Sequence, residues 1–138
     1  MPEKKTLERA KKDKAEGKAP TTQAGEFVRE EMEHIREGKH GARSTKQAIA
    51  IGLSKARRAG VDLPPPRKGT TSEETRKKAE RDLEKGRSGK QGKPSAKRSR
   101  ARLEALKHEP RSAASKSALS KQAKQAAARR RRRGKTTA

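Results

Sequence analysis

Two groups of cationic side chains carry the clearest chemistry in this sequence. Five consecutive arginines, Arg129–Arg133, stand near the C-terminus, and a second group lies upstream. Adjacent like charges repel one another, and they become favourable when phosphates neutralise them and condensed counterions are released. The alternative is a basic tail that only keeps the chain in solution. We expect nucleic acid to contact these residues: Lys97, Arg98, Arg100, Arg102, Lys121, Lys124, Arg129, Arg130, Arg131, Arg132, Arg133 and Lys135.

The residue types that are missing restrict how nucleic acid is recognised. Single-strand modules stack bases on aromatic rings, but the chain has no Trp, no Tyr and one Phe, Phe27, which we place in the core. The loop between the two clearest helices has roughly six residues, more than the three to four of a helix-turn-helix. We therefore expect the chain to bind duplex DNA through phosphates with little sequence preference.

The pattern of residues does not indicate a catalytic site. The chain has no glycine-rich phosphate loop, no nucleophile elbow, no cysteine and no carboxylate pair in apolar surroundings. Glu30 and His34 stand at i and i+4, a spacing that can hold a metal ion. No third ligand is fixed nearby by the sequence, so we interpret them as solvated residues on a helix face. We expect no enzyme activity, no cofactor and no metal.

The overall composition allows only a small core. The chain has 138 residues, of which 40 are Lys or Arg and 17 are Asp or Glu, and its net charge is +23. Only 26% of the residues are hydrophobic, and many of those are alanine. No apolar run approaches the ~20 residues that cross a bilayer, and the N-terminus begins with charged residues. We expect a protein of the cytoplasm, associated with the nucleoid.

The helices that must position these groups are clearest between residues 21 and 66. Apolar residues with helical spacing run from Ala24 to Ile35, after an N-cap at Thr22 and before Gly38. A second helix begins with the capping pair Ser44 and Gln47 and ends at Gly60. Its buried stripe consists of Ala48, Ile49, Gly52, Leu53, Ala56 and Ala59.

These patterns predict a mostly α-helical protein whose core is a two-helix hairpin. We divide the chain into a basic N-terminal arm (1–20), the hairpin with a proline linker (21–66), a charged helix with a glycine-rich linker (67–93) and a basic C-terminal tail (94–138). The arms are rich in charge and alanine, so we expect them to be largely disordered and to become helical only against an anion.

We make two further predictions about the surface of the hairpin. Ile51 projects away from the buried stripe, and we expect it to support a homodimer formed through the helical core. Four glutamates follow the first helix at helical spacing, and we expect them to form an exposed acidic ridge: Glu26, Glu30, Glu33 and Glu37.

The run from Lys46 to Ser54, KQAIAIGLS, followed by the sequence RRAG at 57–60, is similar to a family of small basic bacterial proteins. Some members of that family are labelled plasmid stabilisation proteins. The resemblance covers about residues 24–61 and brings no catalytic or binding residue with it. Two alternatives to a DNA-compacting protein stay open: an RNA- or ribosome-associated factor, and a plasmid-maintenance protein that binds an acidic partner.

Overall fold

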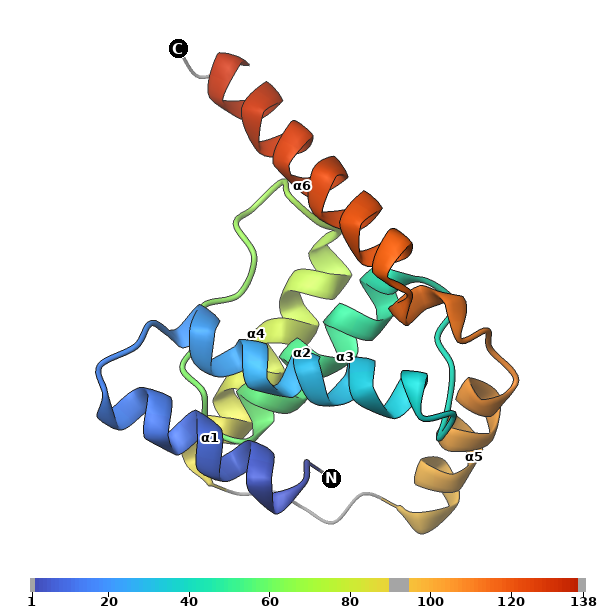
Figure 1. Cartoon of the computed structure of the whole chain (residues 1–138). Helices are drawn as coiled ribbons and strands as arrows, with labels where there is room; N and C mark the ends of the chain where they lie inside the picture. The colour runs from blue at the N-terminus through green and yellow to red at the C-terminus, as the bar shows by residue number, and fades with distance from the viewer. Residues whose placement is uncertain (1, 90–94, 137–138) are drawn as a thin grey trace.

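The predicted hairpin is present as α2 (Pro20–Arg36) and α3 (Thr45–Arg58) in the computed structural model. The structure describes residues 2–89 and 95–136, with only the helical backbone for residues 133–136. Around the hairpin lie the remaining elements of this described part (Figure 1): α1 (Lys4–Ala15), α4 (Glu73–Ser88), α5 (Ala96–Lys107), a 3₁₀ helix η1 (Ser112–Ala114) and α6 (Lys116–Thr136).

The local signals at the ends of the hairpin helices are confirmed with one exception. Ser44 Oγ accepts a hydrogen bond from the Gln47 amide at 3.1 Å. Gly60 has a φ of +104° and ends α3, and the amide of Val61 then donates to the Ala56 carbonyl at 3.0 Å. The exception is Thr22, because α2 begins earlier, with Pro20 in its first turn. Proline suits that position because its missing N–H would have no partner there.

The expectation of a two-helix core with disordered arms is wrong. The chain is a bundle of several helices: the segments assigned to arms form α1, α5 and α6, and the segment predicted as a charged helix forms α4, which packs on α3. Alanines from those segments enter the core, and Ala10, Ala79, Ala113 and Ala114 are each at most 6% exposed. Small side chains let helices approach closely, so these alanines supply packing that a count of large apolar residues leaves out.

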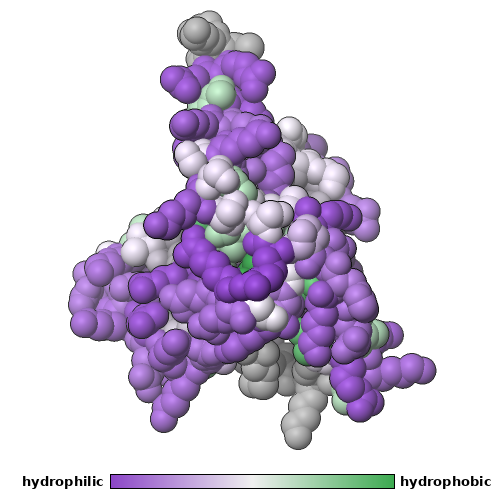
Figure 2. Space-filling model, turned by 45° about the vertical axis from the view of Figure 1, so that its right-hand side comes forward, coloured by the Kyte–Doolittle hydropathy of each residue, from purple (hydrophilic) through white to green (hydrophobic). Residues whose placement is uncertain are grey.

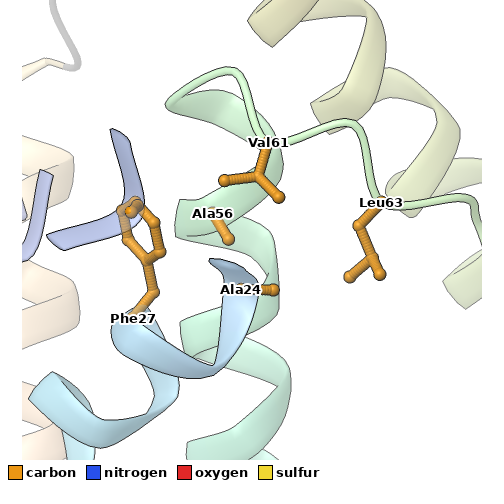
Figure 3. Packing of buried hydrophobic residues seen from close by; sticks show 6 residues of the cluster. Ala24, Phe27, Ala56, Val61 and Leu63 are labelled. Atoms are coloured by element: carbon orange, nitrogen blue, oxygen red, sulfur yellow. The ribbon is translucent and has the colours of Figure 1, made fainter. Parts of the chain in front are cut away.

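One core cluster lies between α1, α2 and the chain that leaves α3. Phe27 and Ala24 of α2 meet Ala56 of α3, with Val61 and Leu63 packed beside them (Figure 3). Arg57 is 7% exposed and donates to the carbonyls of Leu63 at 3.2 Å and Pro64 at 3.0 Å. Burial lowers the pKa of the Arg57 guanidinium. These bonds hold the segment after α3 against the hairpin.

A second cluster lies at the other end of the hairpin and includes the short helix η1. Its buried members are Met32, Ile35, Ala42, Ala48, Ala113 and Ala114. The backbone of η1 is anchored by side chains of the hairpin: Thr45 Oγ1 donates to the Ala113 carbonyl at 2.6 Å, and Arg36 Nε to the Ala114 carbonyl at 2.9 Å. The segment around η1, which was assigned to the C-terminal tail, is therefore part of the folded unit.

Helix α4 covers the side of α3 that was expected to be open. Ser54 Oγ donates to Asp82 Oδ2 of α4 at 2.7 Å. Ile51 on α3 is only 9% exposed in the single chain. The apolar surface on which we based self-association is therefore already covered within one molecule.

Part of the acidic ridge of α2, at Glu26 and Glu30, is covered by α1 and the residues before it, whereas Glu37 at its end stays exposed. Glu30 is 2% exposed and accepts a hydrogen bond from the Glu3 amide at 2.6 Å. Glu26 lies half-buried beside Asp13 of α1, which is 7% exposed. Burial and the neighbouring Asp13 carboxylate raise the pKa of Glu26, and the charges of Arg9 and Arg29 only partly oppose this.

Replacing Glu26 with Gln is expected to stabilise the protein at neutral pH by about 1 kcal/mol, since the amide can donate to Asp13 Oδ2, which lacks a hydrogen-bond partner. Because folding raises the pKa of Glu26, its stabilising contribution is complete below the unfolded pKa and is lost as the pH rises through the folded value. The difference between Glu26→Gln and the natural protein should therefore grow from pH 4 to neutral pH in urea unfolding. A difference that is constant across this range would contradict the assignment.

Candidate nucleic-acid interface

Helix α6 is anchored at its beginning and extends away from the bundle at its end (Figure 1). Ser115 Oγ accepts a hydrogen bond from the Ala118 amide at 3.1 Å, and Leu119 packs against the second core cluster. Just upstream, Arg111 donates to the carbonyls of Ile35 and Arg36, where α2 ends. The base of α6 is thus fixed to the hairpin, and its far end is presented outward.

The outward end carries the arginine segment, Arg129–Arg133. Successive residues of an α-helix differ by about 100° around the axis, so Arg129 to Arg132 already span about 300°. Arg130, Arg131 and Arg132 are exposed and Arg129 is half-buried. Phosphates on either side of the helix can therefore meet a guanidinium. The side chains of Arg133 and Lys135 lie outside the described residues, while Lys121 and Lys124 are exposed nearer the base.

The second predicted group is carried by α5, which places no buried residue in the core. Its four cations are exposed, and within the described residues none of them is ion-paired: Lys97, Arg98, Arg100 and Arg102. In Figure 1 α5 and the far end of α6 stand at opposite ends of the molecule. The structure therefore does not unite the two predicted groups in one patch.

Charge is distributed unevenly over the surface. Cations on the remaining helices stand near carboxylates: Arg76 pairs with Glu73 at 3.3 Å and Glu80 at 3.4 Å, and Arg87 pairs with Asp62 at 2.7 Å. In contrast, residues 110–138 contain ten basic residues and no acidic one. Figure 2 shows hydrophilic residues over most of the visible face and along the projecting helix. The C-terminal segment that includes α6 therefore combines many cations with no carboxylate side chain in its own sequence.

Sequence reasoning missed a second polar arrangement, which we call the Glu–His cluster: Glu3, Glu30, Glu31, His34 and His40. Glu31 and His40 are 1% and 8% exposed, and the His34 side chain is 16% exposed. His34 is therefore not the solvated residue that we expected. The signals in the sequence were the helical spacings of Glu30 and Glu31 to His34, because Glu3 comes from the N-terminus and His40 from the loop after α2.

Among the comparisons with known proteins, one family matches, over the hairpin and the residues beside it. In the described part of the chain, no helix is both long and apolar enough to cross a membrane. No curated protein and no solved structure matches the chain. Residues 11–68 match the profile of a family described as "Family of unknown function (DUF6496)", a segment that includes α2 and α3 and stops short of α4, α5 and α6.

Proposed function

We propose that this protein binds duplex DNA through its phosphates, with little sequence preference, as a DNA-compacting protein of the nucleoid. The observation that carries the proposal is helix α6, which leaves the bundle with its arginine segment outward and belongs to a stretch, residues 110–138, that contains no Asp or Glu. Without a partner, the neighbouring arginine charges of this helix repel one another. Phosphates that supply the counter-charge remove this repulsion.

The shape of α6 favours DNA over double-stranded RNA. The major groove of B-form DNA is wide enough to admit an α-helix, and phosphates line both of its walls. Arginines that point to several sides of one helix suit such a groove better than a flat phosphate surface. The major groove of A-form RNA is deep and narrow, so an arginine-bearing helix enters it less readily.

The separation of α5 from the end of α6 supports compaction in particular. Two basic elements at opposite ends of one molecule can contact two duplex segments at the same time. Each contact is electrostatic and carries no sequence information of its own. Such bridging draws DNA segments together.

The proposal is tested by measuring binding to fluorescent duplexes over a salt series. If ~8 to 10 phosphates are neutralised, log K should fall against log salt with a slope of about −7 to −9. Scrambling the DNA sequence should change the affinity by less than roughly tenfold. A flat salt response would contradict phosphate binding, and an RNA duplex that binds as tightly as DNA would favour the RNA-associated alternative.

A further inference from the structure

We propose that Glu31, His34 and His40 form a binding site for one divalent transition-metal ion, with Zn²⁺ as the best-suited ion. One potential ligand atom from each of the three residues lies within 4.8 Å of the other two. Two of them come from α2 and the third from the loop that follows it. This proposal is independent of DNA binding.

His40 is oriented as a metal-binding histidine usually is. Its Nδ1 lies 2.9 Å from the carbonyl oxygen of Gly41. A carbonyl only accepts hydrogen bonds, so Nδ1 carries the proton and donates it. In the neutral ring Nε2 then holds a lone pair, and this is the arrangement by which a backbone carbonyl commonly fixes a histidine ligand.

The lone pair of His40 Nε2 faces a second acceptor. Glu31 Oε2 lies 3.3 Å from it, yet this buried oxygen has no hydrogen-bond partner. The pair is close but not aligned as a hydrogen bond, and an unpaired buried carboxylate oxygen is costly. Tetrahedral zinc with bonds of about 2.0 to 2.1 Å separates its ligand atoms by about 3.3 Å. A metal ion beside both atoms satisfies them without moving either.

The other carboxylate oxygen of Glu31, Oε1, already accepts a hydrogen bond. Lys55 Nζ of α3 donates to Glu31 Oε1, which fixes the rotamer of the carboxylate and leaves Oε2 directed at His40. Partners in this outer position orient the ligands of many metal sites. Lys55 therefore serves as a positioning residue for Glu31.

His34 provides the third ligand and connects the site to the N-terminus. Its Nε2 lies 3.1 Å from Glu3 Oε1, and this hydrogen bond lowers the pKa of Glu3. Glu3, Glu30 and His34 form a second set of potential ligand atoms that lie within 4.8 Å of one another. Glu30 Oε2 is also buried without a hydrogen-bond partner. Carboxylate oxygens of Glu3 and Glu30 therefore also lie close to the His34 ring.

The type and charge of these groups point to zinc. The chain has no cysteine, so thiolate ligation is excluded, and two imidazoles with a carboxylate form the ligand set of several zinc sites that keep a fourth position for water. Of the three carboxylates in the Glu–His cluster, Glu3 pairs with Lys5 and Lys39, and Glu31 pairs with Lys55. The two buried carboxylates, Glu30 and Glu31, thus share one ammonium group among the described residues, and this local excess of negative charge favours a divalent cation.

The experiment uses the full-length protein after treatment with a chelator and without nucleic acid, titrated with Zn²⁺ alone. We expect one equivalent to bind in isothermal titration calorimetry. A free Zn²⁺ concentration of 100 times Kd should raise Tm by about 10 °C. Co²⁺ in place of Zn²⁺ should give the visible absorption bands of a tetrahedral site.

The variants separate this site from binding of zinc to any histidine. His40→Ala and the isosteric Glu31→Gln should each weaken Zn²⁺ binding at least about 100-fold, because each removes a ligand. His108→Ala is the matched control, since His108 is exposed at the end of α5. Circular dichroism establishes that each variant is folded. The proposal is overturned if folded Glu31→Gln binds Zn²⁺ as the natural protein does, if His108→Ala loses binding, or if the natural protein binds none.

Discussion

Replacing Arg129, Arg130, Arg131 and Arg132 with Gln is expected to weaken duplex DNA binding by at least about 100-fold near 0.1 M salt. Glutamine has nearly the helix propensity of arginine, so α6 is retained while four positive charges are lost. Each phosphate contact contributes about 0.9 to the slope of log K against log salt, so the slope should fall in magnitude by about 3 to 4. Fluorescence anisotropy over a salt series measures both quantities.

A second variant with the same net charge tests whether position matters. Changing Lys77, Lys78, Arg81 and Lys85 of α4 to Gln also removes four exposed cations, but these alternate with carboxylates on the same helix. We expect the affinity to fall by less than about tenfold. Equal losses in the two variants would show that only total charge attracts DNA, and α6 would then not be the interface.

Gly52→Ala is expected to destabilise the fold by at least about 2 kcal/mol. Gly52 lies on α3 where it crosses α2, and a Cβ there would stand 2.7 Å from Val28 Cα and 2.9 Å from the Val28 amide nitrogen. Both are backbone atoms, so the helices must separate to make room, and overpacking of this kind costs more than the helix propensity that alanine gains. Urea unfolding followed by circular dichroism measures the change.

The neighbouring helix provides the control. Gly25 is an exposed glycine in α2, and a Cβ there meets nothing within 4 Å. Gly25→Ala should therefore stabilise the protein by about 0.5 to 1 kcal/mol, because alanine loses less backbone freedom on folding. If both substitutions stabilise, α2 and α3 do not cross at Gly52 as described.

The sequence by itself determined the central hairpin and most of its ends. The spacing from Ala24 to Ile35 predicted the buried face of α2, and Ser44 and Gly60 marked the ends of α3, since capping and left-handed glycines depend only on neighbouring residues. The positive charge of residues 110–138 could likewise be read directly from the sequence. Local pattern and charge are properties of the chain itself and can be read without knowing the fold.

Only the tertiary structure decided what happens to the segments outside the hairpin. Alanines such as Ala113 and Ala114 have little apolar surface, and their spacing in the sequence does not predict a buried helix face. Their burial depends on packing against residues more than sixty positions away, such as Ile35, and on the hydrogen bond from Thr45 to Ala113. Sequence patterns report neighbours three or four residues apart, so they predicted disorder where long-range packing creates helices.

The Glu–His cluster follows the same rule. Glu3 and His40 lie outside α2, and only the docking of the N-terminus and of the loop after α2 brings them to Glu31 and His34 on that helix. Each residue alone resembles an ordinary surface side chain. An unpaired carboxylate oxygen is costly only when it is buried, and that cost is what indicates a binding site. The burial itself arises only when the helices have packed.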